Sequence, residues 1–324
     1  MIDRLCAGLR PRSRTILGPG DDCAILAPIK HPVLVTVDSM VEGVHFRIPW
    51  FSAPVLGRKA LAVNLSDIAA AGGWPLACVI NLAIRPGIDQ RFLAQLYVGL
   101  RQAASEADLD IVGGNITRSP ALAITITLIG EVRRSALRRD TARHGDEIFV
   151  TGSIGDAALG LKILDRKLKA RGAHRHFLVD RFRDPTPRLR AGQALAGLPS
   201  APAAIDVSDG LCQDLGHILD RSGVGAELDA DAIPLSDAYR AVFGDDPSVA
   251  LSSGEDYELL FCMRPGSSAA TLTRRLGVAV HRIGGIVRGK PEIKFTGQSA
   301  PILKSPGIAG FDQLRSGNRS GRRR

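Results

Sequence analysis

The chain has 324 residues, 45% of them hydrophobic, and a mean hydropathy of +0.06, which fits two folded domains and excludes a disordered protein. No apolar run approaches the roughly 18 residues that span a bilayer, and no basic stretch followed by an apolar core opens the chain, so we expect a cytoplasmic protein without a membrane partner. The five cysteines are scattered without a C-x-x-C pair. This spacing argues against a disulfide framework or a zinc site and predicts reduced, mostly buried thiols.

The basic charge is concentrated at the C-terminal end. The formal net charge is +9 and the sequence pI is about 9.7, but five of these nine charges are arginines after Asp312, which leaves +4 for the chain before them. A Ser/Gly/Arg tail of this kind is typical of a solvated, disordered end. Such a tail gives weak, salt-sensitive contact with polyanions, and we expect no specific nucleic-acid partner.

An acidic turn and the strand after it form the first candidate site. The sequence GPGDD at 18–22 predicts a tight turn that presents Asp21 and Asp22, and the β-rich run 33–37 delivers Asp38 at its end. Three carboxylates at the ends of elements suit Mg²⁺, which prefers oxygen ligands. The alternative is that all three are ordinary turn and strand-end residues.

Residues 58–71 predict a helix of good helix formers that ends at a glycine pair. Leu61, Leu65 and Ile68 fall on one face, and Asp67 lies on a neighbouring one. An ionised Asp67 in so apolar a helix needs a cationic partner if it is buried. The alternative is an Asp67 exposed to solvent.

The rest of the first half alternates strands and helices. We expect a strand at 77–84, an amphipathic helix at 89–107, a strand at 111–112 that leads into a flexible polar loop at 113–118, and a half-buried strand at 124–130. The run of basic and polar residues that follows marks the domain boundary, which we set between residues 135 and 136.

The second half begins again with a strand at 147–151 and a glycine turn at 152–156, which opens a helix that ends near Lys169. Glycines at such a turn can hold a phosphate on backbone N–H groups, although the spacing matches no phosphate-binding motif. We expect an exposed basic loop at 171–183 and another helix at 185–198.

Two acids flank a strand-to-helix switch at 204–211. The helix after it is well supported, because Leu211 and Leu215 begin an apolar face of helical period. An N-cap role explains Ser208 or Asp209, but it does not explain Asp206 inside the strand.

A further acidic turn occupies 252–258 and runs into an apolar strand at 259–263. A helix at 267–276 and a strand at 278–287 follow, and residues 306–311 close the ordered chain. Strands and helices interleave in both halves, which predicts two α/β or α+β domains.

The sequence contains many carboxylates in polar turns but no residue in a nucleophile motif, and this combination favours phosphoryl transfer as the reaction. No cysteine or serine lies in a nucleophile motif and no histidine lies in a zinc motif. Phosphoryl transfer needs positioning and charge neutralisation by metal ions more than a nucleophile. A glycosidase also uses paired carboxylates, but it normally exposes aromatic side chains, and the aromatic content here is only 5%.

Seven motifs occur in order along almost the whole chain, up to about Phe311: GPGDDC, TVDSMVEGVHF, KALAVNLSDIAAAG, VGGNITR, GDEIFVTGSIGDAALGL, AIDVSDGLCQDLGHIL and LSSGEDYELLF. Together they resemble the thiamine-monophosphate kinase family, within the ATP-binding superfamily of aminoimidazole ribonucleotide synthetase. The resemblance implies an N-terminal ATP- and Mg²⁺-binding sheet domain at 1–135, which pairs in a homodimer. It also implies a C-terminal α/β sandwich domain at 136–312, with a basic tail at 313–324.

The resemblance also implies an activity: transfer of the γ-phosphoryl group of ATP to thiamine monophosphate with Mg²⁺, giving thiamine diphosphate. The metal ligands that it implies are Asp22, Thr36, Val37, Asp38, Asp67, Asn115, Asp206 and Asp209, with Val37 acting through its carbonyl. Catalytic roles fall to Asp38, Asp67, Asp206 and Arg139, nucleotide contacts to Gly114, Asn115, Arg139 and Ser208, and substrate contacts to His45, Glu255 and Ile308. Because the acceptor phosphate is already ionised, we expect direct in-line transfer without a general base or a phosphoenzyme.

The chain departs from the family pattern at two positions. The family usually has Asp where this chain has Asn115, and an amide contributes no negative charge to a Mg²⁺ site. It tends to place an aromatic residue where this chain has Ile308, so that stacking on the thiamine ring falls to Phe311 or Trp50. A nucleotide-binding paralogue with weak activity, or with a different phosphorylated acceptor, is the alternative function.

Overall fold

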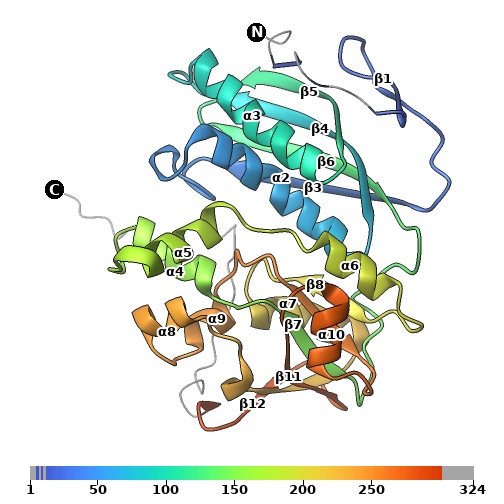
Figure 1. The fold of residues 1–324 in the computed structure, drawn as a ribbon, viewed down its shortest axis with the longest axis vertical. Helices are drawn as coiled ribbons and strands as arrows, with labels where there is room; N and C mark the ends of the chain where they lie inside the picture. The colour runs from blue at the N-terminus through green and yellow to red at the C-terminus, as the bar shows by residue number, and fades with distance from the viewer. Residues whose placement is uncertain (1–4, 7–8, 10–11, 301–324) are drawn as a thin grey trace.

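The first half of the chain is a four-stranded sheet covered on one face by two helices (Figure 1). The structure is a computed structural model and describes residues 5–6, 9 and 12–300. The sheet order is β3-β6-β4-β5, and β4 pairs in parallel with β5 while the other pairs are antiparallel. The elements of this half are β1 (Thr15–Leu17), β2 (Ile25–Leu26), β3 (Val33–Val41), η1 (Ile48–Trp50), α2 (Ala53–Ala70), β4 (Trp74–Ile84), α3 (Gln90–Glu106), β5 (Asp110–Arg118) and β6 (Ala123–Glu131).

The second half is built on a six-stranded sheet with the order β12-β9-β11-β7-β10-β8. Its strands are β7 (Glu147–Thr151), β8 (Ala203–Asp206), β9 (Gly225–Asp229), β10 (Leu259–Met263), β11 (Val280–Val287) and β12 (Ile293–Thr296). Its helices are α4 (Asp156–Leu164), α5 (Gly172–Arg183), α6 (Leu189–Ala196), α7 (Leu211–Ser222), η2 (Ala230–Ala232), α8 (Asp237–Phe243), α9 (Ser248–Ser252) and α10 (Ala269–Leu276). The mixed α/β architecture with two sheet domains is the predicted fold class.

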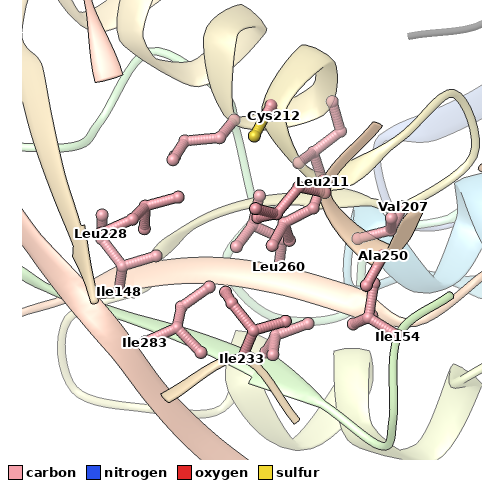
Figure 2. Close-up of a cluster of buried hydrophobic side chains, with 14 of the residues drawn as sticks. Ile148, Ile154, Val207, Leu211, Cys212, Leu228, Ile233, Ala250, Leu260 and Ile283 are labelled. Atoms are coloured by element: carbon pink, nitrogen blue, oxygen red, sulfur yellow. The ribbon is translucent and has the colours of Figure 1, made fainter. Parts of the chain in front are cut away.

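Alternating and helical patterns in the sequence produce these cores directly. Strand β6 alternates buried and half-buried residues, as a sheet with one covered face requires. In the second half Leu211 on α7 packs with Ile148, Leu260 and Ile283 from three strands of the sheet (Figure 2). The apolar face predicted for α7 is therefore confirmed.

Helix α2 lies at the centre of the molecule and contacts both halves. It packs against α3 and the first sheet, and also against α5, α6 and β8 of the second half (Figure 1). Gly99 of α3 allows the closest approach, because a Cβ there would lie 1.8 Å from the Pro54 carbonyl oxygen. Since α2 is enclosed almost all round, polar side chains on it must find partners inside the protein.

Three local predictions were wrong. Residues 113–118 are strand rather than loop, because β4 pairs with them as far as Arg118. The expected basic loop at 171–183 is helix α5, which buries Leu178, Val179 and Phe182 under its basic residues. Helix α4 ends at Leu164 rather than near Lys169.

The other predicted elements match the structure to within a few residues, whereas β1, β2, β9, β12, α8, α9 and the two 3-10 helices were not predicted. All five cysteines are free thiols, three of them buried. Residues 306–311 and the basic tail lie outside the described residues. Within the described part of the chain, no helix combines the length and the apolar character needed to cross a membrane.

Candidate active site

A cleft of about 580 Å³ lies between the two halves of the protein. Strand β3, the 43–50 segment and α2 line it from the first half, and α4, α5 and the loops after β8 and α9 line it from the second. Lys59, Val63 and Asp67 reach it from one stripe of α2, since residues four apart share a helix face.

The cleft brings together four acids that are far apart in the sequence: Asp38, Asp67, Asp206 and Asp209. The Thr36 hydroxyl donates to Asp67 Oδ2 at 2.5 Å. The Ser66 hydroxyl donates to Asp206 Oδ2 at 2.6 Å. The acid cluster expected from the sequence is therefore present, and hydroxyls from β3 and α2 orient two of its members.

The protein leaves the negative charge of this cluster largely uncompensated. Burial, together with the charges of Asp67, Asp206, Asp209 and Glu255, raises the pKa of Asp38 to about 7. Burial and the Asp67 charge raise the pKa of Asp206 to about 7 as well, while its hydrogen bond from Ser66 opposes the rise. Carboxylates that repel one another in this way favour binding of cations.

Arg139 acts electrostatically on three acids of this cluster, although it does not line the cleft. Burial raises the pKa of Asp67, and the Thr36 hydrogen bond and the positive charge of Arg139 oppose that rise. Burial also raises the pKa of Asp206 and of Asp209. The Arg139 charge opposes the rise at both, and at Asp209 the charge of His217 opposes it more strongly. The Arg139 side chain is exposed, so it is available to an anionic ligand.

The donor set fits Mg²⁺, although it is not a finished metal cage. Among the residues that the structure describes, no group of three or more His, Cys, Asp or Glu side chains is arranged as a ready metal site. Mg²⁺ usually keeps several waters and binds through one or two carboxylates plus substrate phosphates. A cluster of buried, mutually repelling carboxylates in an open cleft therefore suits this ion.

Two predicted metal ligands lie away from the cluster. Ser39, Thr125, Asn81 and Asn115 form one cross-strand row, on the face of the sheet opposite to Asp38. Strands β3 and β5 are also the two edges of this sheet, so a single chain does not bring Asn115 to the acids. Asp22 is exposed in the loop between β1 and β2 and does not line the cleft.

Two further predicted ligands lie on β3. Thr36 uses its hydroxyl on Asp67, and the Val37 side chain is 58% exposed on the outer face of the sheet. Gly114, an expected nucleotide contact, has a packing role as well, because a Cβ there would lie 1.9 Å from the Ile80 carbonyl oxygen.

The expected substrate residues His45 and Glu255 both line the cleft. The Val41 N–H donates to His45 Nδ1 at 3.0 Å, which places the ring proton on Nε2 when the imidazole is neutral. Trp50 lines the same cleft, with the Arg47 guanidinium 4.9 Å from its ring centroid. Ile308 and Phe311 lie outside the described residues.

Helix α7 begins after Gly210 without the side-chain cap that was expected from Ser208 or Asp209. Asp214 Oδ2, on the first turn of α7, accepts from the N–H groups of Ser208, Asp209 and Gly210 at 3.0 to 3.1 Å. This carboxylate fixes the loop after Asp206, so that the side chains of Ser208 and Asp209 are left to line the cleft. Asp214 is an acid in the first turn of a helix that the sequence predicts, and this position indicates an interaction with backbone N–H groups at the start of the helix.

The glycine turn at 152–156 does not offer its amides to a phosphate. Asp256 accepts from the Gly155 N–H at 2.7 Å and from the Ala157 N–H at 3.3 Å, both at the start of α4. Asp256 is buried, and burial raises its pKa to about 8 against the effect of Arg181. The acidic turn before β10 is thus tied to the start of α4 by its own side chain.

The chain is similar to known proteins along most of its length. Residues 20–132 match the AIR synthase related protein, N-terminal domain, and residues 143–295 match the AIR synthase related protein, C-terminal domain. Thiamine-monophosphate kinase of Salmonella typhimurium is 41% identical over 292 residues, 88% of this chain and 88% of that protein.

Solved structures of similar proteins share the fold as well. The crystal structure of thiamine-monophosphate kinase from Stenotrophomonas maltophilia K279a has a TM-score of 0.83 and 39% identity, covering 92% of this chain and 96% of that one. AaThiL complexed with AMPPCP and TMP has a TM-score of 0.75 and 31% identity, covering 90% of each chain.

Proposed function

This chain belongs to the thiamine-monophosphate kinase family, and from that premise we propose that it transfers the γ-phosphoryl group of ATP to thiamine monophosphate with Mg²⁺, giving thiamine diphosphate and ADP. The observation that carries the proposal is the convergence of Asp38, Asp67, Asp206 and Asp209 in one cleft. The relative complexed with AMPPCP and TMP supports ATP and thiamine monophosphate as the two ligands.

The reaction brings two anions together, and the residues of the cleft are suited to that task. The acceptor is a phosphate that is already ionised at neutral pH, so no side chain is needed to remove a proton from it. Mg²⁺, when bound, would neutralise charge on the phosphates, with Asp38, Asp67, Asp206 and Asp209 as its proposed holders. Arg139 would bind a phosphate oxygen and offset the remaining repulsion.

The part of the cleft around His45 and Glu255 is proposed to hold the organic half of thiamine monophosphate. Trp50 lines the same cleft. An aromatic face at this position can stack on a flat cationic ring. We therefore assign to Trp50 the stacking role that Ile308 cannot perform.

We propose that two copies of the chain pair through the outer face of the first sheet. Val35 and Val37 on β3 are 67% and 58% exposed there, and Val79 on β4 lies beside them in the cross-strand order. The Asn81 Oδ1 on this face is buried and lacks a hydrogen-bond partner among the described residues. An exposed apolar sheet face with an unsatisfied amide suits a subunit interface, where Asn115 would also lie.

The proposed compartment is the cytoplasm. All five cysteines are free thiols, and reduced cysteines are typical of that compartment.

The proposal is tested by assaying purified enzyme for thiamine diphosphate with ATP, Mg²⁺ and thiamine monophosphate. Formation of the diphosphate with loss of ATP is the expected result. Asn115→Asp addresses the alternative function through the proposed pairing of two chains. If pairing brings residue 115 to a metal site, the added carboxylate should tighten Mg²⁺ binding and raise turnover, whereas a residue that stays away from the acids should leave turnover unchanged. If neither protein phosphorylates thiamine monophosphate, the kinase assignment fails.

A further inference from the structure

Lys59 on α2 is a buried lysine whose ammonium lies at the floor of the cleft. Its side chain is 1% exposed, and Lys59 lines the cleft between the two halves. The ammonium donates to the Phe182 carbonyl oxygen at 2.6 Å and lies 3.6 Å from the centroid of the Phe182 ring. A buried ammonium is costly unless it is paired, so its partners are expected to matter.

The carboxylate that pairs with this ammonium belongs to Glu255. Lys59 Nζ lies 2.6 Å from Glu255 Oε2, and this buried oxygen has no other partner among the described residues. Burial lowers the pKa of Lys59, and the charge of Glu255 opposes that change. The ion pair joins α2 of the first half to the acidic turn before β10 in the second half, across the cleft.

The acidic turn holds Glu255 in a backbone conformation that needs support. Glu255 has φ = 75° and Tyr257 has φ = 51°, both in the left-handed region that side chains other than glycine rarely adopt. The Glu255 N–H donates to the Ser208 carbonyl at 2.9 Å, which ties the turn to the loop that follows Asp206.

The neighbouring acids of the turn are anchored within the second half. Asp256 accepts from amides at the start of α4. Glu258 is enclosed by Arg181, Arg188 and Thr151. Glu255 differs from both, because its anchor comes from the other half of the protein and its side chain is 25% exposed to the cleft.

We propose that Lys59 is a positioning residue of the substrate site, which holds the Glu255 carboxylate in the orientation that receives the cationic organic half of thiamine monophosphate. This inference rests on the proposed function, in which Glu255 contacts that substrate. Lys59 acts through Glu255, because its ammonium pairs with that carboxylate and with the Phe182 carbonyl, and none of its ion pairs or hydrogen bonds among the described residues involves the four acids of the cluster. Loss of Lys59 should therefore weaken binding of thiamine monophosphate and leave ATP binding unchanged.

The test compares Lys59→Met, which keeps an unbranched side chain of nearly the same length and removes its charge, with Leu61→Ala on the same helix. Leu61 is fully buried in the core of the first half and does not line the cleft, so its truncation destabilises the protein without touching the site. In Lys59→Met we expect KM for thiamine monophosphate to rise about tenfold, with kcat within about threefold and KM for ATP within about twofold of wild type. Leu61→Ala should lower the melting temperature and leave both KM values in place.

A double-mutant cycle with Glu255→Gln shows whether Lys59 acts through Glu255. In the Glu255→Gln background, Lys59→Met should change KM for thiamine monophosphate by less than about twofold, because the positioned carboxylate is already gone. An undiminished tenfold effect in that background would overturn the proposal, and so would an unchanged KM in the folded single variant. Should Lys59→Met not fold, Lys59→Gln keeps a donor for the Phe182 carbonyl and is judged by the same criteria.

Calorimetric binding of thiamine monophosphate separates this inference from the kinase assignment. One outcome is that Lys59→Met binds thiamine monophosphate about tenfold more weakly than wild type, while wild type shows no turnover. This outcome would refute the kinase assignment and support the role of Lys59. Turnover by wild type together with equal binding by both proteins would remove the role of Lys59 alone. Absence of binding by wild type would overturn both.

Discussion

Replacing Asp206 by asparagine should stabilise the metal-free protein at alkaline pH while abolishing most of its activity. Asp206 is buried, and burial with the Asp67 charge raises its pKa from 3.8 to about 7. Above pH 7 the folded protein must hold this carboxylate ionised in an unfavourable site, which lowers the free energy of unfolding by about 4 kcal/mol. Below pH 3.8 the carboxyl group is protonated in both the folded and the unfolded state, so this cost vanishes. The stability of wild type due to this group thus falls as the pH rises from about 4 to 7.

Asparagine removes this pH-dependent cost and introduces a smaller one. Its carbonyl can still accept from the Ser66 hydroxyl, but its amide N–H groups need partners at a cost of about 1 to 3 kcal/mol. The variant should therefore be about 1 to 3 kcal/mol more stable than wild type at pH 8 and less stable by a similar amount at pH 4.

Urea unfolding with a chelator present, at both pH values, measures these differences. Glu106→Gln is the control, because its ion pair with Arg58 is on the surface and should contribute less than about 1 kcal/mol at either pH. With Mg²⁺ and ATP added, Asp206→Asn should show activity reduced about 100-fold or more. An Asp206→Asn protein that is less stable than wild type at pH 8 would refute the reasoning that the acids of the cleft repel one another.

Three further predictions concern the frame around the cleft. Glu258→Gln should destabilise the protein by about 3 to 5 kcal/mol in urea unfolding, because it removes the buried carboxylate that Arg181 and Arg188 share; a loss below about 1 kcal/mol would contradict this. Gly99→Ala should lower the free energy of unfolding by about 1 to 3 kcal/mol, because the new Cβ would clash with the Pro54 carbonyl oxygen. The control Gly216→Ala should be neutral or stabilising, because its Cβ would meet no described atom within 4 Å. Equal effects of the two substitutions would show that the contact between α2 and α3 is not tight. Deletion of residues 313–324 should leave kcat and both KM values unchanged in the kinase assay, since the described residues that line the cleft all lie before residue 258. Lost activity would mean that the tail is part of the site.

Local sequence patterns were sufficient for most elements and for the acidic motifs. The alternation in β6 and the apolar face of α7 each arise because one face of the element packs on a single core. Such a pattern predicts the element from its own sequence, without knowledge of the elements that pack against it. Helix α5 was missed because its few buried residues are surrounded by arginines and histidines, and its burial depends on packing against α4 and α8. The strand at 113–118 was missed because its glycines and polar residues are held by pairing with β4 rather than by their own propensity.

The sequence by itself determined the acidic motifs, most of the strands and helices of the first half and the resemblance to the kinase family, because each of these is written in short contiguous motifs. Only the tertiary structure decided which acids meet. It places Asp38, Asp67, Asp206 and Asp209 in one cleft and leaves Asn115 on the opposite face of the sheet. It also pairs Lys59 with Glu255, a contact between residues of the two halves that no local pattern encodes. Convergence of this kind depends on how α2 packs between the two sheets, and packing is a property of the whole chain.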